Sequence, residues 1–101
     1  SRITMLGTSG GGMLTAYVGA IDDRVRVSAI SSWMGSWRTQ IRSMVCHYDA
    51  EQIWWGGLSP LGLDKVDLLI ARAPKPTLVA NGARDGCASA ADAQSALEAA
   101  A

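Results

Sequence analysis

Residues 2–21 of the chain read RITMLGTSGGGMLTAYVGAI. The run Arg2–Leu6 is aliphatic and β-branched and stops at a glycine turn, Gly7–Gly12, as a buried strand entering a tight turn does. Beyond the turn, apolar residues recur at spacings of three and four as far as Ile21, which is typical of a helix that ends near Asp22. The stretch therefore predicts a strand, a glycine turn and a helix in succession. The apolar face of the expected helix consists of Met13, Leu14, Tyr17, Val18 and Ile21.

The turn contains the pattern G-x-S-x-G, from Gly7 to Gly11. In this pattern a serine lies on a strained strand-to-helix turn, and its hydroxyl projects above the sheet. Side chains two residues before or after the serine would collide where strand and helix pass closely, so we expect Gly7 and Gly11 to be required there. The pattern predicts Ser9 as a nucleophile and the Gly10 amide as a donor to an oxyanion. The alternative is a flexible glycine turn with a solvated serine.

Two phosphate-binding patterns compete for the same glycines. Gly7 and Gly12 have the glycine spacing of a P-loop, but Met13 stands where that loop needs a lysine, and Ser9 interrupts a dinucleotide-binding G-x-G-x-x-G. A cofactor phosphate at the start of the following helix stays open as an alternative. Our main expectation is a site without a cofactor and without a metal.

The rest of the chain alternates between strand-like and helix-like segments. Strands are expected at Val25–Ile30 and Thr77–Ala80, and an irregular excursion is expected from His47 to Pro60. Alternation of this kind predicts an α/β fold with about three parallel strands and flanking helices, in one partial domain over residues 1–101 with no internal boundary. Three parallel strands alone would leave two sheet edges unpaired and one face uncovered.

Three further helices are expected between and after these strands. Ser31-Ser32 is a candidate cap for a helix with Trp33, Trp37, Ile41 and Met44 on one face. A second stripe ends before Pro74 and Pro76, because proline disfavours helix in the residue before it. An alanine-rich helix runs from Ser89, its candidate cap, to Ala101, with Asp92 in its first turns. The second stripe consists of Leu63, Val66, Leu69, Ile70 and Ala73.

Composition excludes some classes of partner. Nine basic and nine acidic side chains give a formal net charge of zero, which removes the field that attracts nucleic acid or an anionic membrane surface. No apolar run approaches the roughly 18 residues that a bilayer crossing needs. We therefore expect neither a nucleic-acid partner nor a membrane. The four tryptophans are expected in the core or lining a pocket, with sugar stacking as the lesser alternative.

A nucleophilic serine needs a base and a carboxylate that orients the base. Asp85 follows the expected Thr77–Ala80 strand, and the C-terminal ends of parallel strands are where functional groups gather. A simple turn-forming aspartate before Gly86 is the alternative. His47 is the only histidine and precedes Asp85, whereas the usual α/β order is serine, acid, histidine. We therefore expect the base to lie beyond Ala101 in a longer parent chain, with His47 as a weaker candidate.

The cysteines and the remaining acids do not form a recognisable site. Cys46 and Cys87 are too few for a disulfide scaffold, and we expect two thiols. Cys46 beside His47 is a poor match to a thiol nucleophile, and adding Asp49 and Cys87 gives no metal-ligand spacing. Asp49 and Glu51 are expected to be polar loop residues.

Several blocks together resemble the α/β-hydrolases, in particular the acetyl-xylan-esterase-like, prolyl-oligopeptidase-like branch. By that resemblance Ser9 matches the nucleophile, Gly10 the oxyanion donor and Asp85 the acid. The chain departs from the pattern where Gly86-Cys87 replaces bulkier apolar residues. Counterparts of the strands before the elbow, of the second oxyanion donor and of the downstream histidine are missing. The matching blocks are Gly7–Gly12 with Ala16-Tyr17, Asp49-Ala50-Glu51-Gln52, Gly62-Leu63-Asp64, Ala73–Leu78 and Arg84-Asp85.

The resemblance implies the portion of a serine hydrolase from nucleophile to acid. It implies cleavage of a carboxylic ester, with an acetyl or similar small acyl group and a small-molecule or carbohydrate alcohol, through an acyl-enzyme. Peptide cleavage on the same fold is the next expectation. From a different class, the chain is expected to be a truncated or degenerate homologue without activity, or a module that a second chain or further segments complete. The 101 residues alone are expected to be nearly inactive.

Overall fold

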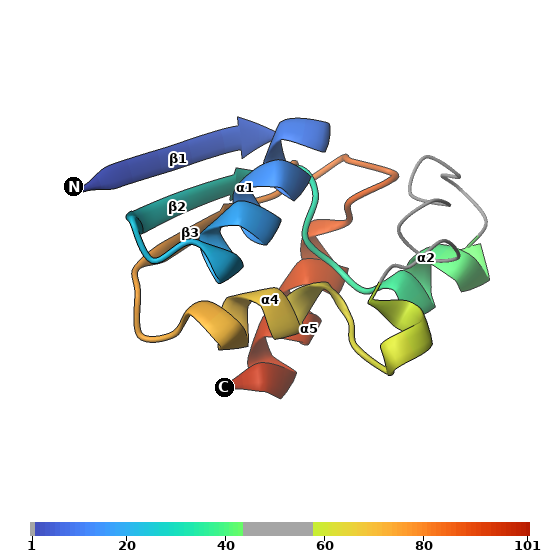
Figure 1. The fold of residues 1–101 in the computed structure, drawn as a ribbon. Helices are drawn as coiled ribbons and strands as arrows, with labels where there is room; N and C mark the ends of the chain where they lie inside the picture. The colour runs from blue at the N-terminus through green and yellow to red at the C-terminus, as the bar shows by residue number, and fades with distance from the viewer. Residues whose placement is uncertain (1, 44–57) are drawn as a thin grey trace.

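The computed structural model describes residues 2–43 and 58–101. Three strands form one sheet in the order β1-β2-β3, and both pairings are parallel (Figure 1). This confirms an α/β fold with three parallel strands and flanking helices. None of the described helices has the length and apolar content that a membrane crossing needs. The elements are β1 (Ile3–Thr8), α1 (Gly10–Ile21), β2 (Val25–Ser31), α2 (Trp37–Ser43), the 3-10 turn η1 (Ser59–Leu61), α4 (Lys65–Arg72), β3 (Thr77–Ala80) and α5 (Ala90–Ala100).

The three strands end level with one another. Thr8 pairs with Ser31, and Ser31 pairs with Ala80. The amide of Ser9 continues the ladder by donating to the Ser31 carbonyl (2.9 Å), and the Ser32 amide donates to Ala80 in the same way (2.8 Å). The residues that follow the strands are therefore brought to a common edge of the sheet.

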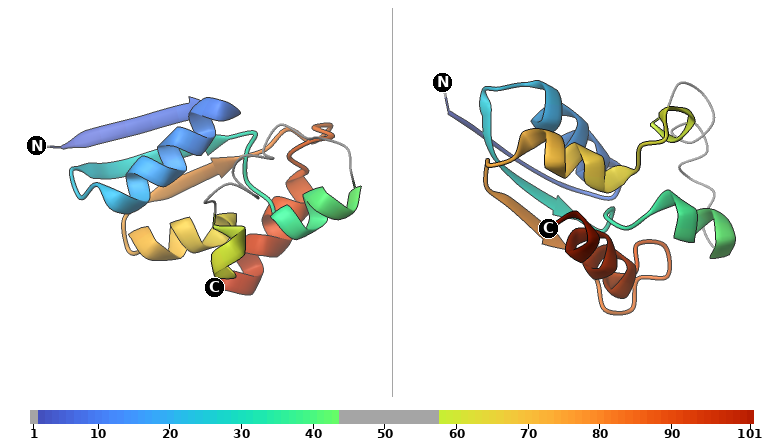
Figure 2. Two further views of the ribbon diagram at one scale, coloured as in Figure 1. Left: turned by 45° about the vertical axis from the view of Figure 1, so that its right-hand side comes forward. Right: turned by 90° about the horizontal axis from the view of Figure 1, so that it is seen from below.

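The described helices α1, α4 and α5 lie on the same side of the sheet (Figure 2). Between them and the strands lies a core to which β2 contributes Ile30. Trp33 and Trp37 are 4% and 1% exposed, which confirms the expected core role for these two tryptophans. The other two, Trp54 and Trp55, lie outside the described residues. The core consists of Ala16, Ile30, Trp33, Met34, Trp37, Leu68 and Ala93.

Helix α1 packs through small residues, which corrects the expected apolar face. Leu14 and Ile21 are exposed, at 56% and 82%. The helix lies so close to the strands that glycine, alanine and threonine fill the contact and larger side chains point elsewhere. Its buried residues are Gly12, Thr15, Ala16 and Gly19.

The expected cap at Ser31-Ser32 is wrong. Ser31 is still in β2, and the helix begins only at Trp37. Two distant carboxylates bind its first amides: the Trp37 N–H donates to Asp64 (3.0 Å) and the Ser36 N–H donates to Asp92 (2.7 Å). Strand pairing with β3 holds Ser31 extended, and carboxylates from other helices take the capping role.

The remaining expectations divide between right and wrong. β3 has the predicted bounds, and the Ser89 hydroxyl accepts from the Asp92 amide at the start of α5 as predicted. β1 continues through Gly7 to Thr8, further than expected. The stripe before Pro74 is wrong in detail, because Leu63 and Ile70 are exposed. The residues of α4 that are buried are Lys65, Leu68 and Arg72.

The face of the sheet opposite the helices carries an apolar row. Leu6 pairs with Ala29, and Ala29 pairs with Leu78, so the three lie side by side across the sheet. Leu6 and Leu78 are 78% and 63% exposed. Within the described part of the chain this face is uncovered, as expected for an isolated three-stranded parallel sheet.

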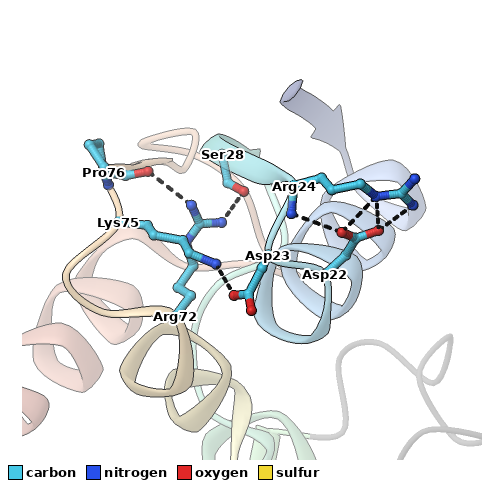
Figure 3. Close-up of polar contacts among 7 residues, drawn as sticks. All are labelled: Asp22, Asp23, Arg24, Ser28, Arg72, Lys75 and Pro76. Atoms are coloured by element: carbon cyan, nitrogen blue, oxygen red, sulfur yellow. Dashed lines mark hydrogen bonds and ion pairs between the residues drawn. The ribbon is translucent and has the colours of Figure 1, made fainter. Parts of the chain in front are cut away.

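A buried arginine ties α4 to the start of β2 and β3. The Arg72 guanidinium donates to the Ser28 hydroxyl and to the Pro76 carbonyl (3.2 Å), and the side chain is 1% exposed (Figure 3). A Cβ on Gly19 would lie 2.5 Å from Arg72 Nη1, so a glycine in α1 makes room for it. Burial lowers the pKa of Arg72.

The turn before β2 carries a second arginine in a very different setting. Arg24 binds Asp22 through Nη2 (2.7 Å) and Nε (3.0 Å), and its side chain is 69% exposed (Figure 3). This hydrogen-bonded pairing lowers the pKa of Asp22 to about 2. Solvent screens an exposed pair of this kind, so its contribution to folding is small.

Comparison of the two arginines tests this account of the packing. Arg72→Ala is expected to lower the free energy of unfolding by about 2–4 kcal/mol, because it leaves a cavity and removes both donors from buried acceptors. Arg24→Ala is the matched control and is expected to change it by about 0.5 kcal/mol or less. Urea denaturation followed by circular dichroism measures both. Equal effects would contradict the assignment of Arg72 as an interior tie.

Candidate active site

Ser9 lies at the sharp bend between β1 and α1. Its torsions are φ 56° and ψ −119°, in a region that L side chains rarely adopt. Its side chain makes no capping hydrogen bond to the helix, and the residue is exposed. The hydroxyl is therefore presented at the surface from a strained backbone, as the G-x-S-x-G pattern predicts.

The bend is enforced by the close approach of β1 and α1 at Gly7. A Cβ on Gly7 would overlap the Gly11 carbonyl and would lie 2.9 Å from Thr15 Oγ1. Gly12 is also confined, because its Cβ would lie 2.8 Å from the Ser31 carbonyl oxygen. Gly11 itself has open space where a Cβ would be, so the expected need for glycine at this position is wrong. Its backbone, not its missing side chain, meets Gly7.

Gly10 is the first residue of α1. The first amides of a helix have no partner within the helix, and the helix dipole favours negative charge beside them. The Gly10 amide immediately follows the Ser9 bend, which is the position that the predicted oxyanion donor needs. A Cβ on Gly10 would meet nothing within 4 Å.

Asp85 lies in the turn after β3, at the edge where the strands end. Its Oδ1 accepts hydrogen bonds from the amides of Cys87 (2.9 Å) and Ala88 (3.0 Å), which makes it a turn-forming aspartate as well as a candidate acid. These two bonds, with a smaller contribution from the Ser32 hydroxyl, hold the pKa of Asp85 below its usual value. Within the described residues no cation pairs with Asp85. Hydrogen bonds alone hold its ionised form.

The structure brings Ser9 and Asp85 to the same edge of the sheet, one strand apart. Neighbouring strands are about 4.8 Å apart, so the ends of β1 and β3 are separated by roughly 10 Å. This span leaves room for a group the size of an imidazole between hydroxyl and carboxylate. The described residues include no histidine, since His47 lies outside them.

The other candidate residues give little to this site. Cys46, Asp49 and Glu51 also lie outside the described residues, so the metal and thiol alternatives that include them are not tested. Residues 2–43 and 58–101 contain no cluster of three metal-ligating side chains. Cys87 is disulfide-bonded, and the expected free thiol at this position is wrong.

Two residues near the site went unnoticed in the sequence. Asn81 Nδ2 donates to the carbonyls of Met34 and Ala88 (both 2.8 Å), so it ties the Asp85 turn to the segment after β2. Ser32 has a φ of 51° at the end of β2. The Ser31-Ser32 pair resembled a helix cap, and only the pairing of β2 with β3 reveals that Ser32 ends a strand.

Paired substitutions test the steric origin of the bend. Gly7→Ala is expected to lower the free energy of unfolding by more than about 3 kcal/mol, because its Cβ would overlap backbone atoms that cannot move independently. Gly11→Ala adds the same methyl group to a helix with open space and is expected to stabilise by about 0.5–1 kcal/mol. Urea titrations of both variants provide the measurement. A tolerated alanine at position 7 would contradict the close crossing.

Comparison with known proteins supplies no relative for this arrangement. No family model, no curated protein and no solved structure matches the chain. The chemistry of the site has to be inferred from its own geometry.

Proposed function

We propose that the chain carries the nucleophile and the acid of a serine hydrolase that cleaves carboxylic esters through an acyl-enzyme. The observation that carries this proposal is the exposed serine with φ 56° between a strand and a helix. Backbone strain at a surface residue persists only where the surrounding structure enforces it, and it concentrates at functional sites. Here the crossing at Gly7 enforces it.

In the proposed reaction Ser9 Oγ attacks the ester carbonyl carbon while a base takes the hydroxyl proton. The carbonyl oxygen becomes an oxyanion, towards which the Gly10 amide donates. The bond to the alcohol oxygen then breaks, and the base returns its proton to the leaving alcohol. Water hydrolyses the acyl–Ser9 ester by the same steps, so the products are a carboxylic acid and an alcohol.

Asp85 is assigned the role of orienting the base. Its carboxylate keeps its charge because two amides bind it, and a charged acceptor stabilises the imidazolium that forms when the base is protonated. We assign the base to a group outside this chain, because His47 precedes Asp85 and so reverses the chain order of the α/β-hydrolases that the sequence resembles.

The open surface at the bend favours a small acyl group. Ser9, Gly10 and Gly11 are all exposed, and no large side chain stands at the start of α1. An acetyl ester of a small molecule or carbohydrate is the substrate class proposed. Peptide cleavage needs the same nucleophile and remains the second choice within this class.

A second candidate function has its own observation. The apolar row of Leu6, Ala29 and Leu78 is uncovered in the described part of the chain. A non-catalytic piece that further segments or another chain complete would carry such a face. This candidate predicts no special reactivity at Ser9, and chemical labelling therefore separates the two.

A fluorophosphonate probe tests the proposed nucleophile directly. We expect slow, stoichiometric labelling of Ser9 in the 101-residue chain, raised several-fold by added imidazole, which supplies the missing base. Ser9→Ala is expected to abolish labelling and Asp85→Asn to remove most of the imidazole effect. Mass spectrometry of the intact chain and of its peptides measures both.

Labelling that survives Ser9→Ala, or that spreads over several serines, would exclude the proposed nucleophile. Rapid Ser9-dependent turnover of an acetyl ester without imidazole would instead contradict the assignment of the base to a group outside the chain. Ser95→Ala, an exposed serine of α5, is the matched control and is expected to leave labelling unchanged.

A further inference from the structure

Two non-glycine residues have a positive φ in the part of the chain that the structure describes, and both are serines. Ser9 has a φ of 56° at the end of β1, and Ser32 has a φ of 51° at the end of β2. The proposed reaction accounts for the first and leaves the second unused. A strained, non-glycine backbone beside a candidate site points to a role for its side chain.

Ser32 lies between the two residues of the proposed site. Its amide donates to the Ala80 carbonyl (2.8 Å), which fixes it beside the end of β3. The preceding carbonyl, that of Ser31, accepts from the Ser9 amide (2.9 Å). The middle strand therefore binds the nucleophile strand on one side and the acid strand on the other, and Ser32 is the residue at which it leaves the sheet.

The Ser32 hydroxyl hydrogen-bonds to the Asp85 carboxylate. The other donors to this carboxylate, the amides of Cys87 and Ala88, both bind Oδ1 and both belong to the same turn as Asp85. Ser32 is thus the described donor that reaches Asp85 from a different strand. Donors on one oxygen alone hold the carboxyl group in place but leave its plane free to turn. A donor from β2 adds a fixed direction.

We propose that Ser32 is a positioning residue, which acts through Asp85 by fixing the carboxylate plane so that it can orient the base for Ser9. This inference rests on the proposed function and adds a residue to it. The left-handed backbone of Ser32 is what turns its hydroxyl from the end of β2 towards the neighbouring strand. The strain and the hydrogen bond thereby have one explanation.

The test uses the full 101-residue chain and the variant Ser32→Gly. Glycine adopts a positive φ without strain, so this variant removes the hydroxyl and keeps the backbone. Ser95→Ala is the matched loss of a hydroxyl away from the site, and Asp85→Asn removes the group through which Ser32 is proposed to act. Urea denaturation checks that each variant is folded.

The first readout is the titration of the Asp85 carboxyl carbon by NMR, which does not depend on any reaction at Ser9. Ser32→Gly is expected to raise the pKa of Asp85, because a donor to the charged form is lost, while the two amide donors keep it below its usual value. Ser95→Ala is expected to leave the pKa unchanged. An unchanged pKa in Ser32→Gly would overturn the proposal.

The second readout is imidazole-dependent labelling of Ser9 at pH 8, where the Asp85 carboxylate is ionised in every variant that retains it. Ser32→Gly is expected to slow it about tenfold, the usual effect of one hydrogen bond to a charged group. The double variant Ser32→Gly/Asp85→Asn is expected to be no slower than Asp85→Asn alone, since Ser32 acts through Asp85. Additive losses would overturn the positioning role.

The two readouts separate the two levels of inference. A shifted Asp85 pKa with unlabelled Ser9 in the wild-type chain would refute the proposed hydrolase function, and the catalytic role of Ser32 with it, while leaving the contact itself established. A labelled wild-type chain whose rate is insensitive to Ser32→Gly would refute Ser32 alone.

Discussion

The close crossing of β1 and α1 is the constraint from which the rest of the site follows. The strand and the helix approach until the Gly11 backbone occupies the space that a side chain on Gly7 would need. The chain must then reverse between Thr8 and Gly10, and the only residue left to make the turn is Ser9, whose φ becomes positive. An ordinary serine is thereby lifted out of the sheet and kept away from the capping bonds that would occupy its hydroxyl.

The level strand ends convert this local bend into a site with several components. Parallel pairing places Ser9, Ser32 and Asp85 in neighbouring positions along one edge. Asn81 holds the Asp85 turn to the segment after β2, and the turn in turn holds the carboxylate through two amides. Interactions at the opposite edge, chiefly the buried Arg72, fix the helices against the start of the strands and leave the functional edge open.

Local patterns in the sequence predicted local features well. The bounds of β3, the cap at Ser89 and the bend at Ser9 each depend on residues within a few positions of one another, so they can be recognised from spacing and residue type. The burial of α1 could not be recognised in this way. Its helical period indicates two candidate faces, one of large and one of small residues, and only the distance between strand and helix selects Gly12, Ala16 and Gly19.

Features that depend on distant segments were missed for the same reason. The caps of α2 come from Asp64 and Asp92, which are 27 and 56 residues from the amides they bind. Ser32 acquires its geometry from pairing with β3, far along the chain. For the acid the sequence indicated Asp85, but its charged state depends on amides that face it only once the turn is formed.

The backbone of Ser9 offers the most direct test of the central claim that the strand–helix crossing forces a reactive geometry on this residue. Scalar couplings across its N–Cα and Cα–C′ bonds, measured by NMR on the isotopically labelled chain, report both torsions in solution. The account predicts a single conformation with φ near 56° and ψ near −119°. A negative φ, or averaging among several conformations, would contradict it.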